Sequence, residues 1–224
     1  MLSRFNDGIL ARVYGHADIE GLCAEASVPV INALSDREHP LQGLADMLTM
    51  REAFGALRGL TVAWVGDGNN VCATLLSAAP AMGFDVQVAT PPGYGVAPAL
   101  LARATAAAAA AGTRIAVGAD PRAALAGAHV VATDTWVSMG QEAEKAARQA
   151  AFAGFQVTER LAADAGAHPE WRFLHCLPRK PDEVDDEVFY SPRRSLVWDE
   201  AENRMWTVMA VLLAQMDGGA VVPA

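Results

Sequence analysis

The sequence of 224 residues is poor in cysteine, in basic charge and in long apolar runs. Its three cysteines, Cys23, Cys72 and Cys176, are spaced neither as a disulfide framework nor as a zinc site, which indicates a reducing compartment. The net charge of −9 argues against a nucleic-acid partner, because phosphate binding needs a basic stripe. No apolar run reaches about 18 residues and no signal-peptide pattern opens the chain, so we expect a soluble, cytoplasmic protein without a membrane partner.

The sequence also lacks a complete dinucleotide fingerprint. The loop Gly66-Asp67-Gly68-Asn69-Asn70 follows an expected strand and opens an expected helix, but Val71 stands where the third glycine belongs. The next strand ends in Val88-Ala89-Thr90-Pro91, without the acid that would bind a ribose hydroxyl. The pattern therefore disfavours a nicotinamide cofactor, and the two adjacent amides are placed to hold a carboxylate and an ammonium group instead.

What is present indicates an α/β fold with a proper core, since 52% of the residues are hydrophobic and 19% are charged. Expected strands alternate with expected helices, which predicts a doubly wound parallel sheet. The strands are expected at 61–65, 85–89, 114–117, 129–133 and 171–174, and the helices near 69–82, 97–111, 121–126 and 141–150. Two further helices are predicted, one with Pro40 in its first turn that runs to about Phe54, and one over 200–216.

Residues 1–34 form a separate, smaller unit in this prediction. They read as strands at 9–14 and 28–31 with a helix at 18–26 between them. Two strands cannot bury the faces of a sheet, so we expect the remnant of a second α/β domain.

The stretch Leu174-His175-Cys176-Leu177-Pro178-Arg179 is the strongest candidate for a functional site. Ligands of open parallel sheets lie beyond the carboxyl ends of the strands, where Cys176 is expected, and a thiol there can hold or polarise a reacting amine. An ordinary buried core cysteine is the competing interpretation, because free cysteine is among the most buried residue types.

Other candidates each have an ordinary alternative. Asp134 follows the strand that ends at Thr133 and is placed to bind a cationic amine, although an Asx turn explains it equally well. His39 is expected at a helix N-terminus, where the helix dipole attracts anions and lowers the histidine pKa, or it is a capping residue. Arg204 is either an anion ligand or a surface arginine. Two runs are interpreted as structural only, a solvated helix face over 141–150 with a Glu144–Arg148 pair, and an acidic surface turn over 180–187.

Four motifs taken together resemble the ornithine carbamoyltransferases, in the order of that family and over nearly the whole chain. They are His39-Pro40-Leu41-Gln42, Asp134 to Gly140, His175 to Arg179 and Ala201-Glu202-Asn203-Arg204. The His-Cys-Leu-Pro motif separates ornithine enzymes from the aspartate carbamoyltransferases. The resemblance implies a carbamoyl-phosphate domain remnant over 1–40, an ornithine-binding Rossmann-like domain over 41–199, and a helix over 200–224 that packs back on the first domain.

The resemblance also implies roles for individual residues. L-ornithine would be bound by Asn69, Asn70, Asp134, Ser138 and Met139, and Cys176 with Asp134 and the Leu177 carbonyl would orient its δ-amine. Carbamoyl phosphate would contact Arg12, His39, Gln42, Cys176, Leu177 and Arg204, and the catalytic residues would be Cys176, His39, Arg12 and Arg204. The implied reaction yields L-citrulline and phosphate in arginine and amino-acid biosynthesis, and needs neither a metal nor an organic cofactor.

One family motif is missing from these 224 residues, the Ser-x-Arg-Thr-Arg loop that holds the phosphate. We therefore expect an N-terminally truncated chain, through a misassigned start or a fragment rather than a natural short protein. Such a chain would be inactive or nearly so alone, without the homotrimer contacts of the family, and with an apolar patch on its last helix. The alternatives are a non-catalytic amino-acid-binding or regulatory paralogue, and a carbamoyltransferase for another amine such as putrescine or an acylated ornithine.

Overall fold

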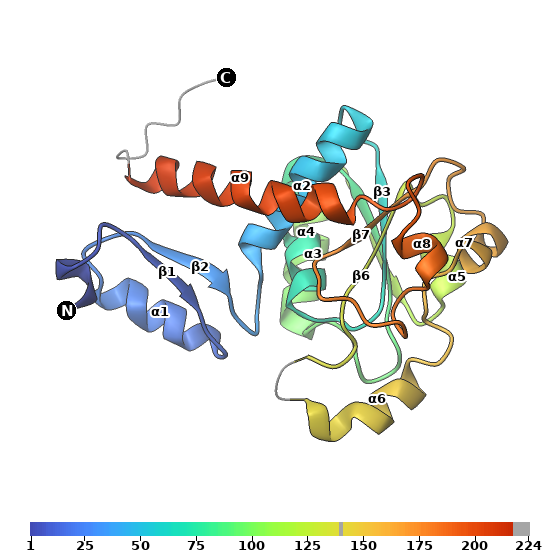
Figure 1. Ribbon diagram of the computed structural model, residues 1–224, viewed down its shortest axis with the longest axis horizontal. Coiled ribbons are helices and arrows are strands. Elements are labelled where there is room, and N and C mark those ends of the chain that lie inside the picture. Colours follow the sequence, from blue (N-terminus) through green and yellow to red (C-terminus); the bar gives the residue numbers. More distant parts are fainter. Residues whose placement is uncertain (139–140, 217–224) are drawn as a thin grey trace.

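The chain folds into a large α/β lobe and a small N-terminal lobe, joined by two long helices (Figure 1). The computed structural model describes residues 1–138 and 141–216. The elements of the small lobe are η1 (Leu2–Arg4), β1 (Ile9–Arg12), α1 (His16–Glu25) and β2 (Val30–Leu34). The long helices are α2 (Pro40–Phe54) and α9 (Val197–Met216). The large lobe holds β3 (Thr61–Val65), α3 (Asn70–Met82), β4 (Asp85–Ala89), α4 (Pro98–Ala111), β5 (Ile115–Gly118), α5 (Pro121–Leu125), β6 (Val130–Thr133), η2 (Glu142–Glu144), α6 (Lys145–Ala151), α7 (Glu159–Ala165), β7 (Arg172–His175) and α8 (Asp186–Phe189).

The large lobe confirms the predicted doubly wound parallel sheet. Its strand order is β5-β4-β3-β6-β7, and every neighbouring pair is parallel. The chain leaves β3 in one direction along the sheet and returns on its other side to β6, so the topological switch lies between these two strands. Ligands of such sheets bind at the switch, beyond the strand ends, which is where the predicted loops after β3 and β6 lie.

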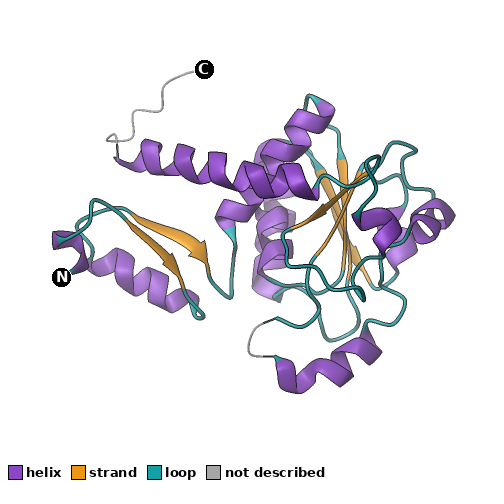
Figure 2. Cartoon of the chain, viewed as in Figure 1, coloured by secondary structure: helices purple, strands orange, loops and turns teal. Residues whose placement is uncertain are grey.

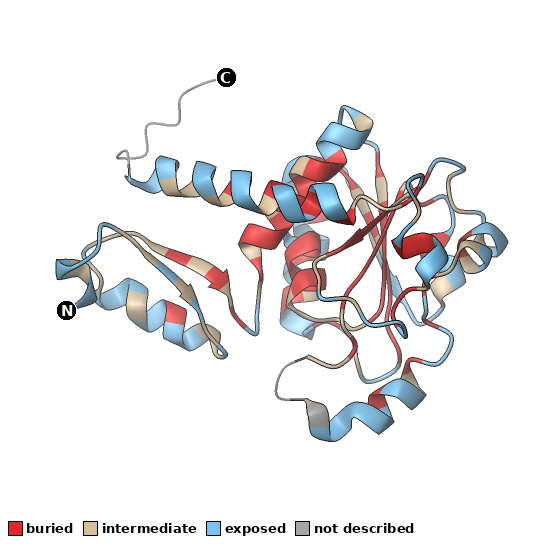
Figure 3. Cartoon of the chain, in the orientation of Figure 1, coloured by how far each residue is buried: buried red, intermediate tan, exposed pale blue. Residues whose placement is uncertain are grey.

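Helices lie on both sides of the sheet, and its central strands are buried (Figures 2 and 3). The side chains of β3 alternate between two buried clusters, as a period of two requires. Val62 and Trp64 face a core built with α2, α3 and α4, while Ala63 and Val65 face a core built with α5, α8 and the segment after α6. Both faces of the sheet are covered, which explains why its strands read as continuous apolar runs.

The small lobe has little core of its own. β1 and β2 are parallel, and the pairing of Ile9 with Val30 begins β2 two residues later than the sequence predicts. Its buried hydrophobic residues are few, namely Ile19, Ile31 and Ala33. The two latter residues pack with Leu41 of α2 and against partly buried residues of α9, so the helices connect the lobes.

Helix α9 is covered on one side only, which confirms the predicted apolar patch. Val208, Val211 and Leu212 pack against the cluster of β2 and α2. The opposite side leaves large side chains exposed, namely Met205, Trp206, Met209, Leu213 and Met216. No helix among the described residues is both long and apolar enough to cross a membrane.

Candidate functional site

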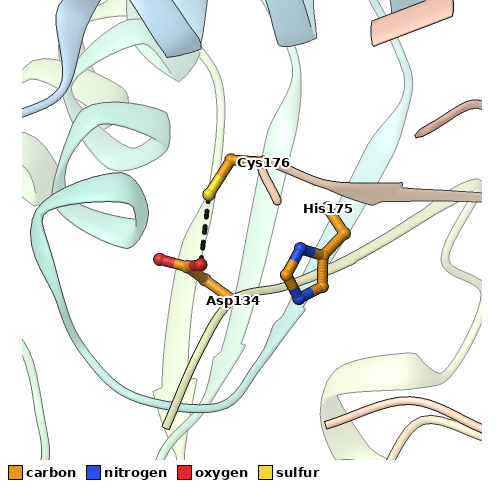
Figure 4. Close-up of side chains that lie close together, drawn as sticks. All are labelled: Asp134, His175 and Cys176. Atoms are coloured by element: carbon orange, nitrogen blue, oxygen red, sulfur yellow. Dashed lines mark hydrogen bonds between the residues drawn. The ribbon is translucent and has the colours of Figure 1, made fainter. Parts of the chain in front are cut away.

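Two strand ends bring Cys176 and Asp134 together, which confirms their predicted proximity (Figure 4). β6 and β7 are adjacent, with Thr133 opposite His175, so the residues that follow each strand leave the sheet side by side. The Cys176 thiol donates a hydrogen bond to Asp134 Oδ1 at 3.1 Å. Burial, and then the Asp134 carboxylate, raise the pKa of the Cys176 thiol well above its usual value, so the sulfur carries its proton at neutral pH.

The loop after β3 holds the second oxygen of Asp134. Asn69 caps helix α3, since its Oδ1 accepts from the Val71 and Cys72 amides at 3.0 and 3.1 Å. Its Nδ2 donates to Asp134 Oδ2 at 2.7 Å. Each carboxylate oxygen of Asp134 therefore has a donor, and the side chain is held across the switch point.

Asn70 and Gly68 serve the same loop in different ways. Asn70 Nδ2 donates to the carbonyl of Ser35 at 2.7 Å, which ties the loop to the segment between the lobes. A Cβ on Gly68 would lie 2.4 Å from the Val96 amide nitrogen, so only glycine permits this approach of two loops. Asn70 thus contacts the linker, and the predicted contact with ornithine stays a prediction.

The loop after β6 carries Ser138, whose amide is hydrogen-bonded within its own loop. Lys180 reaches across from the loop after β7, and its Nζ donates to Thr135 Oγ1 at 2.9 Å and to the Val137 carbonyl at 2.8 Å. These bonds fix the two loops against each other. Met139 lies outside the described residues.

Three of the residues predicted for carbamoyl phosphate, His39, Gln42 and Arg204, lie near the N-terminus of α2. His39 is the N-cap residue ahead of Pro40, and its buried Nδ1 has no hydrogen-bond partner among the described residues. Burial, and then the charges of Arg204 and Arg12, lower the His39 pKa to about 3, so the imidazole is neutral at pH 7. The sequence predicted this direction from the helix dipole, whereas burial is the larger cause. Gln42 Oε1 accepts from Arg204 Nη1 at 2.9 Å.

Asp46 and Glu200 form a buried pair behind this group, which the sequence reasoning missed. Gln42 Nε2 donates to Asp46 Oδ1 at 2.8 Å and to Glu200 Oε1 at 2.7 Å. Burial raises the pKa of Asp46 to about 6. Burial, and then the charge of Asp46, raise the pKa of Glu200 well above its usual value. The spacing of Gln42 and Asp46 places them on one helix face, but nothing in the sequence links them to Glu200.

The predicted acidic surface turn over 180–187 is wrong at Glu183, which is 1% exposed. Its carboxylate accepts from His175 Nε2 at 3.0 Å, from the Lys180 amide at 2.8 Å and from the Trp136 amide at 3.3 Å. A carboxylate with three N–H donors is satisfied inside the protein, which is why this acid is buried whereas Asp182 is exposed. The spacing of the acids gave no signal for this difference.

The predicted solvated face over 141–150 is likewise wrong at Arg148, which is buried. The expected pair with Glu144 is present at 3.0 Å, but a second one joins Arg148 Nη1 to Asp67 Oδ2 at 3.0 Å. The same nitrogen donates to the Trp136 carbonyl at 3.0 Å. Arg148 therefore fastens α6 to the loops after β3 and β6.

Asp134, His175 and Cys176 place one ligand atom each within 4.8 Å of one another, a spacing compatible with a metal ion. However, His175 Nδ1 accepts from the Leu177 amide at 3.0 Å, and its Nε2 is bonded to Glu183. Both ring nitrogens are engaged, so two ligands remain, and the donor set does not favour a metal site.

The family models and the known proteins that match this chain all carry descriptions of one kind. Residues 58–215 match the family described as "Aspartate/ornithine carbamoyltransferase, Asp/Orn binding domain", and residues 1–52 match its "carbamoyl-P binding domain". "Ornithine transcarbamylase, mitochondrial" of Gallus gallus is 51% identical over 96% of this chain and 60% of its own length. "Ornithine carbamoyltransferase" of Thermus thermophilus is 53% identical over 95% of this chain and 67% of its own length.

Solved structures agree with this similarity. The ornithine carbamoyltransferase of Pyrococcus furiosus superimposes with a TM-score of 0.92 at 47% identity, over 97% of this chain and 69% of that one. That of Thermus thermophilus gives a TM-score of 0.84 at 48% identity, over 96% and 68%. The chain spans about 60% of the length of several curated relatives that it matches.

Proposed function

This chain belongs to the aspartate/ornithine carbamoyltransferase family, and from that premise we propose that it binds L-ornithine for transfer of a carbamoyl group from carbamoyl phosphate. The observation that supports ornithine over aspartate is the 3.1 Å hydrogen bond between Cys176 and Asp134. A carboxylate beside a sulfur acceptor suits an amine, and it would repel the second carboxylate of aspartate. We extend the proposal to arginine biosynthesis, which the resemblance implies, and to the cytoplasm, which the composition favours.

In the proposed complex Asn69, Asn70, Asp134, Ser138 and Met139 bind the α-amino and α-carboxylate groups of ornithine. The δ-amine lies against Cys176 Sγ, Asp134 and the Leu177 carbonyl. An amine attacks a carbonyl carbon only in its neutral form, so the δ-ammonium group must first release a proton to solvent. Cys176 and Asp134 offer acceptor atoms at the right place for holding the neutral amine.

Carbamoyl phosphate is proposed to lie beside Arg12, His39, Gln42 and Arg204, with Cys176 and Leu177 at its carbamoyl end. The δ-nitrogen forms a bond to the carbamoyl carbon, and a tetrahedral oxyanion results. Arg204 and the neutral His39 stabilise that oxyanion by hydrogen bonds. As the bond between the carbamoyl carbon and the phosphate oxygen breaks, the leaving phosphate takes the electron pair of that bond and the extra proton of the attacking nitrogen, and citrulline and phosphate leave.

Calorimetry of the chain with L-ornithine tests the binding step. We expect saturable one-site binding that Asp134→Asn weakens by about tenfold or more, because a charge-assisted bond to the amine is lost. Putrescine and an acylated ornithine serve as competitors, and both should bind more weakly because they lack the free α-amino acid group. Absence of ornithine binding, or preference for a competitor, contradicts the proposal. Citrulline formation from ornithine and carbamoyl phosphate tests the transfer. We expect it to be very slow for these 224 residues alone, because the Ser-x-Arg-Thr-Arg loop that holds the phosphate is missing from them, and an ordinary enzyme rate would contradict that expectation.

A further inference from the structure

The buried carboxyl pair of Asp46 and Glu200 lies behind the residues proposed to bind carbamoyl phosphate. Asp46 is 3% exposed and Glu200 is 2% exposed, and both carboxyl groups accept from the same nitrogen, Gln42 Nε2, at 2.8 and 2.7 Å. Two ionised carboxylates that flank one nitrogen out of contact with water would repel each other, and burial raises the pKa of both groups. The pair therefore holds one proton between its members.

The pair determines which way the Gln42 amide points. Its Nε2 faces two carboxyl oxygens, so its Oε1 must face away, where it accepts from Arg204 Nη1 at 2.9 Å. The reverse orientation would place the amide oxygen against carboxyl oxygens and the N–H groups against a guanidinium group. Arg204 is thus aimed through Gln42 by the two acids.

Glu200 also reaches the other half of the site. Its Oε2 accepts from the His175 amide at 2.8 Å, at the last residue of β7 and next to Cys176. One carboxyl group therefore contacts the chain beside the thiol, while its other oxygen contacts Gln42. This arrangement links helix α2, helix α9 and the end of β7 at one point.

We propose that Asp46 and Glu200 are a positioning pair, which by retaining one shared proton keeps Arg204 and Cys176 aligned for carbamoyl transfer to L-ornithine. The inference rests on the proposed function and deepens it. The charged and titratable groups that act on the pair are Arg204 from α9, Asp134 from the loop after β6 and Cys176 after β7. Loss of the shared proton would place two like charges in contact, with Arg204 as their nearby cation.

Three variants separate positioning from simple packing of α2 on α9. Glu200→Gln leaves one acceptor oxygen for two donors, so either Gln42 or the His175 amide loses its partner. Asp46→Asn is the conservative variant, because its amide oxygen can still accept from Gln42 Nε2 and both oxygens of Glu200 keep their donors. Thr49→Val is the packing control: it removes the bond from Asn203 Nδ2 to Thr49 Oγ1 at 3.0 Å, in the same helix interface but away from Gln42.

The readouts are the dissociation constant for L-ornithine and the pH profile of Cys176 alkylation by iodoacetamide, followed peptide by peptide. We expect Glu200→Gln to raise the dissociation constant for L-ornithine about tenfold. It should also speed alkylation of Cys176 at pH 8 several-fold, because the His175 amide and Gln42 compete for the one remaining acceptor and the chain beside the thiol is held less firmly. Asp46→Asn should have less than half that effect, and Thr49→Val should leave both readouts within about twofold while lowering Tm. Equal effects of Glu200→Gln and Thr49→Val, or no effect of Glu200→Gln, would overturn the proposal.

Carboxyl ¹³C NMR of the unaltered chain gives a test that needs no variant to fold. We expect one of the two carboxyl groups to be protonated at pH 7, and two ionised carboxylates there would refute the inference. If the unaltered chain fails to bind ornithine, the proposed function fails, but the alkylation profile and the NMR titration still decide the role of the pair.

Discussion

At the scale of single residues, the pairing of a thiol with a carboxylate gives the site an exchangeable hydrogen bond. The S–H group is a weak donor, whereas an ammonium group is a strong one toward a carboxylate. An incoming amine can therefore displace the thiol from Asp134 Oδ1, and the sulfur then becomes an acceptor for the same amine. A serine at this position would hold Asp134 more tightly and offer a harder acceptor atom.

This view predicts that Asp134 suppresses the reactivity of Cys176. Replacement of Asp134 by Asn removes the negative charge 3.1 Å from the sulfur, so the thiol pKa should fall and alkylation at pH 8 should speed up by about tenfold. The pH dependence of iodoacetamide labelling at the Cys176 peptide measures the effect. The exposed Cys23 is an internal control, since its labelling rate should be the same in both proteins. Unchanged labelling of Cys176 would show that burial alone sets its reactivity.

The sequence could identify Cys176 and Asp134 because both follow apolar strands, and parallel strands end at one edge of a sheet. It could not identify Glu200 or Glu183, since a buried acid is recognised by its partners rather than by its neighbours in the chain. Glu183 stands in an acidic run beside the exposed Asp182, and only the folded loops supply its three donors. Residues that hold other residues in place are thus harder to find from sequence than residues at strand ends.

At the scale of elements, helix α2 carries buried polar residues of the candidate site at its N-cap and in its first two turns. His39, Gln42 and Asp46 lie along it at helical spacing, and Gln42 and Asp46 are linked to α9 through Glu200 and Arg204. The sequence predicted the helix and its first proline correctly, because Pro40 favours the first helical position. The burial of its polar face depends on α9, about 150 residues later in the chain, and local pattern carries no information about that contact.

The buried His39 predicts a specific dependence of stability on pH. Its pKa is lowered from 6.5 to about 3 in the folded chain, so the unfolded chain binds the extra proton between these values. The free energy of unfolding therefore falls as pH falls below 6.5, by up to about 1.4 kcal/mol per pH unit from this group. Urea unfolding at pH 7, 6 and 5 measures this effect. Between pH 7 and pH 5 the free energy of unfolding should fall by about 2 kcal/mol less in His39→Asn than in the unaltered chain. Parallel pH profiles for the two proteins would contradict this cause.

At the scale of the whole molecule, the two lobes differ in how much core supports them. The large lobe has a five-stranded sheet covered on both faces, whereas the small lobe has two strands and shares its apolar cluster with α2 and α9. A two-stranded sheet is marginal by itself, so the stability of the small lobe depends on the helices that connect it.

The rate of amide hydrogen exchange should therefore differ between the two lobes. We expect residues 9–34 to exchange through local opening, well before the amides of β3, β4 and β6, because few buried apolar contacts oppose that opening. Ile31→Ala should speed exchange over 9–34 further, since it removes a side chain of the cluster shared with Leu41. The same variant should leave exchange in β3 and β4 unchanged. Uniform protection across both lobes, or an equal response of β3 to the substitution, would mean that the lobes unfold as one cooperative unit.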